Sequence, residues 1–377
     1  MRKWITPLAV LAIAEVLAGL VLRFNVELLV VYPVLLVLIP GLMDLRGDVY
    51  GAVGYRLTKA LHLGLTSPSL RSRYNLVNSL TGFVVSTIAS VNLSLIGMGL
   101  SLLTRISSPD LTSLLFISLF STLVVYFILT PVILASVVVM FKRGHDPSPF
   151  IATIVTGIGD FVSPTALLLV AQLHDSFHYI VKSLTVLAIV LASMVFTVYL
   201  IREKESRDLV ENLVSATLGS TGSSFGGFVL ALYIELISRS PELLGVLPAF
   251  NAVIGAAMGY LGNELNIDLH IGVEKTSRSY YGNAVLGFFA TYSSIIIALF
   301  LTALPTGSWF TSIARVLGVV SLACMIVYAL STVVTYWLTI QTYKHGWDPD
   351  NVVFPIMTTF VDLMGPTVIS ITGLLVT

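Results

Sequence analysis

Eleven long apolar runs constrain this chain more than any other feature. They fall at residues 5–22, 26–43, 75–103, 111–141, 149–173, 177–201, 214–237, 243–262, 281–305, 310–342 and 351–376. A run of about 18 apolar residues or more is long enough to cross a bilayer as a helix. In lipid such a segment must satisfy its backbone hydrogen bonds internally, which leaves no alternative to a helix. The sequence therefore predicts an all-α polytopic membrane protein with eleven transmembrane helices.

The composition argues against a soluble domain and against a nucleic-acid partner. Hydrophobic residues make up 56% of the 377 residues, charged residues make up 11%, and the formal net charge is zero. The single cysteine, Cys324, cannot form an internal disulfide. We expect membrane lipid to surround the protein. Only four residues precede the first run.

The distribution of basic residues predicts the orientation. If the N-terminus is cytoplasmic, the inner segments hold 15 of the 20 lysines and arginines. These are Arg2, Lys3, Arg46, Arg56, Lys59, Arg71, Arg73, Lys142, Arg143, Arg202, Lys204, Arg207, Lys275, Arg278 and Lys344. Cytoplasmic loops carry an excess of basic residues. We therefore expect a multi-pass protein of the cell membrane with its N-terminus inside and its C-terminus outside.

One stretch occurs twice. FKRGHDPSPFIATIVTGIGDFVSPT begins at residue 141, and YKHGWDPDNVVFPIMTTFVDLMGPT begins 202 residues later. Each copy carries an aspartate near the middle of an apolar run, Asp160 in the first and Asp362 in the second. Thr156 and Thr358 precede these aspartates by one helical turn. A carboxylate within a membrane span is costly and is by default a functional residue.

The two halves also match elsewhere, at an offset of 208 residues. The matching pairs are Ala18-Gly19 with Gly226-Gly227, Pro40 with Pro248, Gly47 with Gly255, Gly51 with Gly259, Gly54 with Gly262 and His62 with His270. The sixth run has no counterpart, and one additional crossing gives two five-helix repeats the same orientation. The prediction is a 5+1+5 pseudo-dimer of parallel repeats, with repeats at 1–175 and 208–377 joined by a linker helix at 176–207. We expect it to act as a monomer.

The two aspartates point to a divalent cation. Equivalent residues of parallel repeats converge if their helices line the shared axis, which would present two carboxylates to one ion. Mg²⁺ takes oxygen ligands and usually keeps several waters, and Thr156 and Thr358 could hold those waters. The alternative role for Asp160 or Asp362 is a helix cap or the partner of a buried arginine. No lysine or arginine is expected at comparable depth in any span, which favours the cation.

A second group of candidates lies where the second run ends. Proline and glycines between residues 40 and 54 predict an interrupted helix, and interruptions at matching places in two repeats indicate a binding region. Asp44 and Asp48 are four residues apart and share a helix face. The second repeat offers Asn251 there. A solvated helix end explains the two aspartates equally well.

Glu15, in the first run, has Ser223 as its counterpart in the second repeat. It could supply an additional carboxylate for coupling, or it could form a hydrogen bond between helices. The residues do not separate these two roles.

Gly157-Ile158-Gly159-Asp160 matches the G-x-G-D motif of intramembrane aspartyl proteases. Those enzymes also need an aspartate preceded by tyrosine on the preceding helix and a downstream Pro-Ala-Leu, and this chain has neither. An intramembrane protease is therefore a further alternative, for which only this motif speaks.

The stretch PGLMDLRGDVYGAVGYRLTKALHLG, from Pro40, resembles the second-helix signature of the MgtE magnesium transporters and their solute-carrier-41 relatives. The helices that carry Asp160 and Asp362 are similar to that family's fifth membrane helix, whose aspartate lines the ion pathway. PAFNAVIG, which contains Asn251, resembles the second half of the solute-carrier branch. Asp48 stands where the family usually has asparagine.

The resemblance implies a divalent-cation transporter or channel, with Mg²⁺ as the transported ion and Mn²⁺ as a possible surrogate. The implied pathway follows the pseudo-twofold axis, with Asp160, Asp362, Asp48, Asp44 and Asn251 as metal residues. The implied supporting residues are Thr156, Thr358, Glu15, Gly47 and Gly255. A Na⁺- or H⁺-coupled secondary transporter of another solute is the second alternative.

Overall fold

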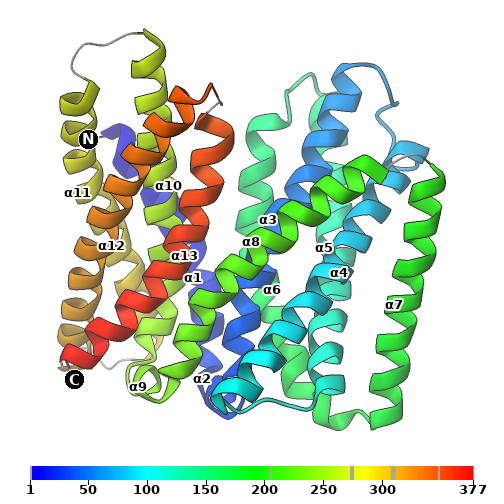
Figure 1. The fold of residues 1–377 in the computed structure, drawn as a ribbon, viewed down its shortest axis with the longest axis horizontal. Helices are drawn as coiled ribbons and strands as arrows, with labels where there is room; N and C mark the ends of the chain where they lie inside the picture. Colours follow the sequence, from blue (N-terminus) through cyan, green and yellow to red (C-terminus); the bar gives the residue numbers. More distant parts are fainter. Residues whose placement is uncertain (1, 204–205, 272–275, 307–310, 347–348, 377) are drawn as a thin grey trace. The chain divides into compact units, whose positions relative to one another are not determined.

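The computed structural model describes residues 2–203, 206–271, 276–306, 311–346 and 349–376, and the regular secondary structure of these residues is entirely helical. The longer helices are α1 (Arg2–Phe24), α3 (Val34–His62), α4 (Arg73–Thr104), α5 (Leu111–Lys142), α6 (Ser148–Leu173), α7 (Tyr179–Arg202), α8 (Ser206–Leu232), α10 (Glu242–Ile271), α11 (Thr276–Ala303), α12 (Thr311–Lys344) and α13 (Pro349–Val376). Two short helices, α2 (Val26–Val31) and α9 (Ile234–Ser238), lie between them (Figure 1). The predicted all-α class is confirmed.

Among the described residues, nine helices are long and apolar enough to cross a membrane. They are α1, α4, α5, α6, α7, α10, α11, α12 and α13. The two other predicted spans correspond to α3, which carries Asp44, Arg46 and Asp48 in its middle, and to α8, which is rich in serine and glycine. The total of eleven spans therefore stays a prediction.

Helix α3 corrects the expected interruption. It runs without a break from Val34 to His62 and includes Pro40, so the residues between 40 and 54 are helical. Helix α10 is likewise continuous around Pro248. Proline and glycine are tolerated in membrane helices when neighbouring helices pack against them. The glycines of α3 serve this packing, as shown below for Gly41 and Gly54.

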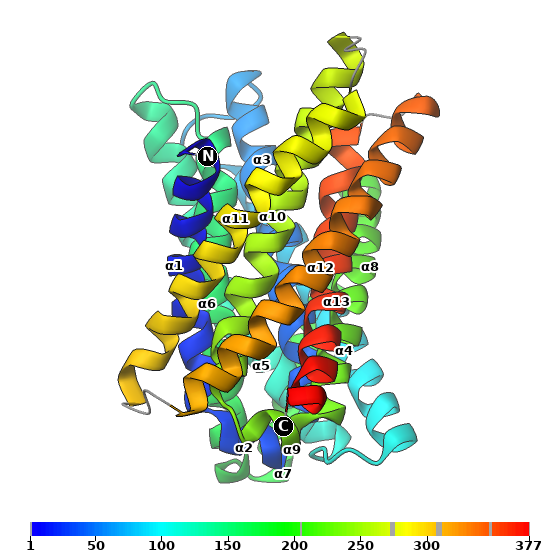
Figure 2. The same ribbon diagram turned by 90° about the vertical axis from the view of Figure 1, so that its left-hand side faces the viewer.

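The helices form two compact units. Val31–Ala231 make one, called the α3 unit, and Met1–Val30 with Leu232–Thr377 make the other, called the α10 unit. In the α3 unit, α3 packs against α4, α5 and α6. In the α10 unit, α10 packs against α11, α12 and α13 in the same order, and Figure 2 shows several of these helices side by side.

One pair of contacts repeats almost atom for atom. A Cβ atom on Gly54 of α3 would lie 2.8 Å from Cγ2 of Ile151 on α6. A Cβ atom on Gly262 of α10 would lie 2.9 Å from Cγ1 of Val353 on α13. Both glycines let a β-branched residue of the aspartate-bearing helix approach the backbone. The sequence repeat is therefore also a repeat of packing.

The first helices of the two repeats are exchanged. Helix α1 packs against α10 and α11 of the second repeat, and a Cβ atom on Gly19 would overlap the carbonyl oxygen of Gly245. Helix α8, the first of the second repeat, meets α3 of the first repeat, where a Cβ atom on Gly227 would overlap the carbonyl oxygen of Leu36. The compact units therefore differ in their bounds from the predicted repeats, whose limits stay a prediction.

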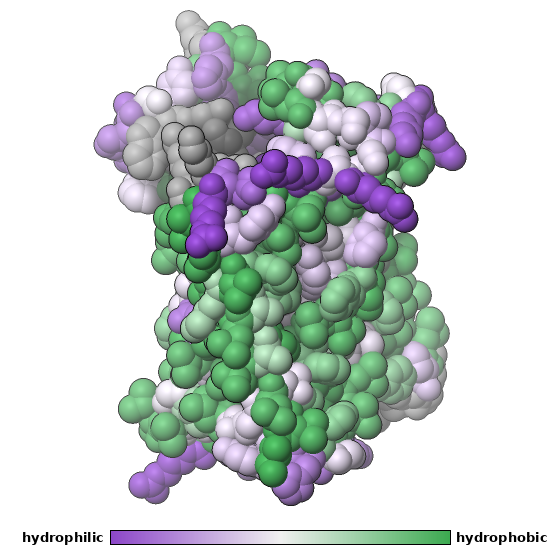
Figure 3. Space-filling view, turned by 90° about the vertical axis from the view of Figure 1, so that its right-hand side faces the viewer, coloured by the Kyte–Doolittle hydropathy of each residue, from purple (hydrophilic) through white to green (hydrophobic). Residues whose placement is uncertain are grey.

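Helix α7, the predicted linker, packs against α4 and α5. Buried Lys182 near its start donates a hydrogen bond of 2.6 Å to Ser113 at the start of α5. Most other side chains of α7 are apolar, and many of them are exposed, Leu184, Leu191 and Val195 among them. Figure 3 shows a broad apolar belt on the face of the molecule where α7 lies, with hydrophilic residues gathered at its margins. This surface suits a lipid environment.

Candidate cation site

The carboxylates of Asp44 and Asp48 converge beside α8. Ser223 of α8 donates a hydrogen bond to Asp44 Oδ2. A Cβ atom on Gly219, one turn earlier in α8, would lie 3.0 Å from Asp48 Oδ2 and 3.9 Å from Asp44 Oδ2. Two acidic side chains of α3 therefore reach the same short stretch of α8, which confirms that they share a helix face.

Small residues make this close approach possible. A Cβ atom on Gly41 would lie 2.7 Å from the carbonyl oxygen of Ser220 and would overlap the hydroxyl of Ser224. Gly227 meets the α3 backbone one turn further along, as described above. Small residues at helix interfaces let membrane helices pack at backbone distance. A larger residue at Gly41 or Gly227 would separate the two helices and move α8 away from the carboxylates.

Two carboxylates and a hydroxyl form an incomplete ligand set. In the described ranges there is no group of three or more histidine, cysteine, aspartate or glutamate residues placed to hold a metal ion. Mg²⁺ tolerates such a site because it commonly binds one or two carboxylates and retains its waters. The arrangement can attract a hydrated divalent cation, whereas a fully dehydrated ion would need more protein ligands.

Asp160 of α6 does have a basic neighbour, which corrects the expectation from sequence. Arg46 of α3 is 2% exposed, α3 packs against α6, and Arg46 lies close enough to Asp160 to be attracted by its charge. The expectation was wrong because the apolar run ends at residue 43, whereas the helix continues to His62 and carries Arg46 into the helix bundle. A buried arginine near Asp160, one of the alternatives considered for this aspartate, is therefore present.

In the α10 unit, Asn251 and Gly255 of α10 face the aspartate-bearing helix α13. A Cβ atom on Gly365 would overlap Oδ1 of Asn251, so the amide side chain lies directly on the α13 backbone. A Cβ atom on Gly255 would lie 3.4 Å from Cγ2 of Thr358. Thr358 in turn donates its hydroxyl proton to the carbonyl oxygen of Pro355, so its oxygen is left as an acceptor and ligand.

Asp362 lies between these two contacts in α13 and is partly exposed within the structure. Asp160 is also partly exposed, and Thr156 on the preceding turn is exposed. Gly47 has no atom within 4 Å of a Cβ position. Because Asp160 belongs to the α3 unit and Asp362 to the α10 unit, their predicted convergence stays a prediction.

Glu15 of α1 is buried, with 2% of its surface exposed. Helix α1 runs antiparallel to α10, because Arg23 pairs with Glu242 and the ring of Trp4 packs on Tyr260. Between these two contacts, Glu15 falls beside the part of α10 that contains Asn251. At the crossing of α1 and α10 the carboxylate therefore belongs to α1 (Glu15). At the crossing of α8 and α3 it belongs to α3 (Asp44).

Sequence reasoning missed two residues of this region, Arg46 and Gly219. A signal for Arg46 was its position midway between Asp44 and Asp48, since a helix continuing through both aspartates would also include it. Gly219 lies in the small-residue segment 219–224, which is typical of a close helix crossing. Its partner helix could not be read from local sequence.

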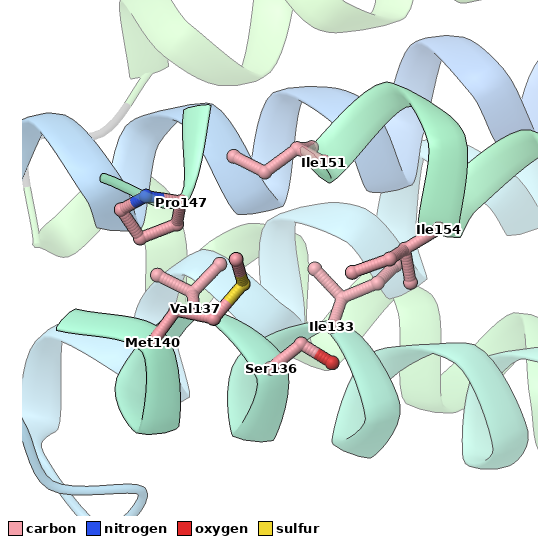
Figure 4. A pocket seen from close by; sticks show the side chains of 7 residues that line it. All are labelled: Ile133, Ser136, Val137, Met140, Pro147, Ile151 and Ile154. Atoms are coloured by element: carbon pink, nitrogen blue, oxygen red, sulfur yellow. The ribbon is translucent and has the colours of Figure 1, made fainter. Parts of the chain in front are cut away.

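A small cavity between α5 and α6 offers no ion site. Its lining is apolar except for Ser136, and Figure 4 shows these side chains. The lining residues are Ile133, Ser136, Val137, Met140, Pro147, Ile151 and Ile154. Without a carboxylate, this space suits an apolar group.

Comparison with known protein families identifies the family to which the chain belongs. The family model of MgtE, described as a divalent cation transporter, matches residues 39–170 and 247–372. The chain belongs to the MgtE family. The MgtE match covers α3 to α6 and α10 to α13, the two sets of helices that pack alike, and it includes Asp44, Asp48, Asp160, Asn251 and Asp362.

Two curated relatives extend the likeness of this MgtE protein. Solute carrier family 41 member 2 of Mus musculus is 21% identical over 378 residues, and the Gallus gallus protein of the same name is 22% identical over 382 residues. Each alignment covers 89% of this chain, and the chain spans 63% of the length of each relative. No solved structure matches the chain.

Proposed function

We propose that this protein carries Mg²⁺ across a cell membrane along a route lined by Asp160 and Asp362. One carboxylate comes from each repeat, at the same position of α6 and α13. Two negative charges suit a divalent cation, and carboxylate and threonine oxygens suit Mg²⁺ in particular.

The observation that carries the proposal is the repeated packing of the aspartate-bearing helices. Ile151 of α6 packs against Gly54, and Val353 of α13 packs against Gly262. The distance from the glycine's Cβ position to the nearest methyl carbon is nearly the same in both pairs. Each aspartate therefore has the same height and rotation relative to its glycine-rich partner helix. Membership of a family of divalent cation transporters adds independent support.

The second part of the proposal concerns the approach to this route. Asp44 and Asp48, drawn together beside Gly219, would concentrate hydrated cations at the α3–α8 crossing. Asn251 would offer an amide oxygen in the other repeat. Two like charges that lie close together attract a divalent cation more strongly than a monovalent one, because the Coulomb energy scales with the ion's charge.

Uptake into liposomes that contain a Mg²⁺-sensitive dye tests the proposal. We expect Asp160→Asn and Asp362→Asn each to lower uptake to the background of empty liposomes, because each removes a charge from the route. Asp146→Asn is the control, since Asp146 lies exposed in the loop before α6. Each variant must elute as the parent does in size-exclusion chromatography. If either membrane variant transports like the parent, that aspartate does not line the route.

The same liposomes distinguish a Mg²⁺ transporter from a Na⁺- or H⁺-coupled transporter of another solute. Mg²⁺ uptake should follow the Mg²⁺ gradient, with Mn²⁺ as a competing ion. Any dependence on an imposed Na⁺ or proton gradient would identify an exchanger of Mg²⁺. A protein that moves neither Mg²⁺ nor Mn²⁺ under any of these gradients would contradict the proposal.

A further inference from the structure

Arg46 is a buried cation within the proposed ion-conducting region. Its side chain is 2% exposed, and its Nη1 and Nη2 atoms have no hydrogen-bond partner among the residues that the structure describes. Desolvation of a guanidinium is costly unless a negative charge balances it. Asp146 and Ile151 of the α6 segment meet His62 and Gly54 of α3, so the two helices run antiparallel. Arg46, eight residues before Gly54, therefore lies at the level of Asp160, nine residues after Ile151. Asp160 is thus placed to supply the balancing charge, and it attracts Arg46 electrostatically.

The second repeat lacks this arginine. At the offset of 208 residues that relates α3 to α10, the position of Arg46 is taken by Ile254, which is fully buried. The two repeat-related aspartates therefore differ in their surroundings, although their helices pack alike. A strictly symmetric ion site would not need such a difference.

We propose that Arg46 and Asp160 are counter-charges of each other. Asp160 neutralises the arginine so that it does not repel the passing cation, whereas Asp362 binds the cation. This inference rests on the proposed function, because it assigns different tasks to the two carboxylates of that route. Arg46 is then a positioning residue that does not touch the ion.

The proposal makes the effect of losing Asp160 depend on Arg46. In Asp160→Asn, the arginine remains buried with its charge unbalanced, and a cation must pass a repelling charge. At an effective dielectric constant of about 20, unit charges several ångströms apart interact by more than the thermal energy. Removing Arg46 as well removes the repulsion. The loss caused by Asp362→Asn has a different origin, so the same second change should leave it unaltered.

Mg²⁺ uptake into liposomes with single and double variants tests this. We expect Arg46→Met with Asp160→Asn to raise Mg²⁺ uptake at least tenfold above the background to which Asp160→Asn alone falls. Arg46→Lys with Asp160→Asn keeps the positive charge and should stay inactive. Arg46→Met with Asp362→Asn should also stay inactive.

Thermal unfolding of the same variants gives a readout that does not depend on transport. Asp160→Asn should lower the melting temperature, and adding Arg46→Met should recover part of that loss, because the unbalanced charge is gone. Additive losses in melting temperature would overturn the pairing. These melting temperatures also test the pairing of Arg46 with Asp160 if the double variant proves too unstable for reconstitution into liposomes.

The two proposals fail in different ways. If Asp362→Asn transports like the parent, the proposed function is wrong. If Asp362→Asn is inactive but Arg46→Met does not raise the uptake of Asp160→Asn, the proposed function stands and this inference is overturned. Asp160 would in that case bind the ion itself.

Discussion

Arg23 of α1 and Glu242 of α10 form a buried ion pair, with Nη2 of the arginine 2.7 Å from Oε1 of the glutamate. The two side chains are 3% and 5% exposed. Arg23 also donates a hydrogen bond to the carbonyl oxygen of Thr302 on α11. One arginine of the first repeat therefore holds two helices of the second repeat, and the pair fixes the exchanged helix α1 in place.

Breaking this pair should destabilise the protein. We expect Glu242→Ala to lower the free energy of unfolding by about 3–5 kcal/mol, since Arg23 remains buried without its carboxylate. Arg23→Met combined with Glu242→Met should lie close to the parent, because apolar pairs often replace buried ion pairs at little cost. Denaturant unfolding in detergent, followed by tryptophan fluorescence, measures both. Equal losses for the single and double variants would show that the charge pairing is not what matters.

A methyl group at Gly219 should weaken cation binding. In Gly219→Ala the new Cβ atom lies 3.0 Å from Asp48 Oδ2, and the carboxylate must move. A displaced rotamer costs about 0.5–1.5 kcal/mol, which predicts a roughly two- to tenfold weaker affinity for Mn²⁺. Electron paramagnetic resonance of Mn²⁺ titrated into the purified protein measures this affinity.

The matched control for that prediction is Gly99→Ala on α4, where a Cβ atom meets nothing within 4 Å. Both substitutions raise helix propensity by the same amount. If the two variants bind Mn²⁺ equally, the carboxylates beside Gly219 take no part in binding the ion.

Asp110 should make stability depend on pH at the start of α5. It caps this helix by accepting hydrogen bonds from the backbone N–H and the hydroxyl of Ser113. Burial alone would raise the pKa of Asp110, but these hydrogen bonds and the charge of Lys182 outweigh it and hold the pKa below its ordinary value. The stabilisation is therefore complete above the unfolded-state pKa of about 3.9 and is lost as the pH falls through the lower folded-state pKa.

Melting temperatures at several pH values check this sign. At neutral pH, Asp110→Ala should lower stability by about 0.5–2 kcal/mol, the usual cost of a lost helix cap. The difference from the parent should shrink below about pH 3.9. Asp110→Asn retains the cap and should lose less. A gap that widens in acid would mean that the carboxylate is not stabilised in its charged form.

The predicted orientation can be tested with single cysteines. In a Cys324→Ala background, His145→Cys in the exposed loop after α5 should react with an impermeant thiol reagent only from the cytoplasmic side. Thr104→Cys, exposed at the C-terminal end of α4, should react only from outside. Labelling of both from one side would contradict the alternation of spans, and the reverse pattern would invert the topology.

The sequence was most informative where the signal is local. Apolar runs predicted helices because lipid permits few other structures. The matching glycines of the two halves, Gly54 and Gly262, make similar contacts with the helices that carry the matching aspartates. The family followed from the stretch that starts at Pro40. The helical class and the family are thus largely local properties of a few segments.

Long-range relationships could not be read in this way. The density of glycine and proline in α3 indicated a break, whereas the glycines provide room for neighbouring helices. Arg46 was assigned to a polar loop because Asp44 ends the apolar run. The partner of Ser223 depends on whether α8 packs against α3 or α10. Both helices have nearly equal patterns of small residues, so the local sequence does not indicate which one α8 meets.

The exchange of first helices has a consequence for synthesis of the protein. Gly19 of α1 contacts Gly245, which the ribosome adds more than two hundred residues later. At about 5–20 residues per second, α1 must wait roughly 10–45 s in the membrane before its partner helix emerges. Helix α8, in contrast, meets α3 as soon as it is made, because α3 is already there. During that interval the newborn chain must shield α1, with its buried Glu15, by lipid or by the insertion machinery.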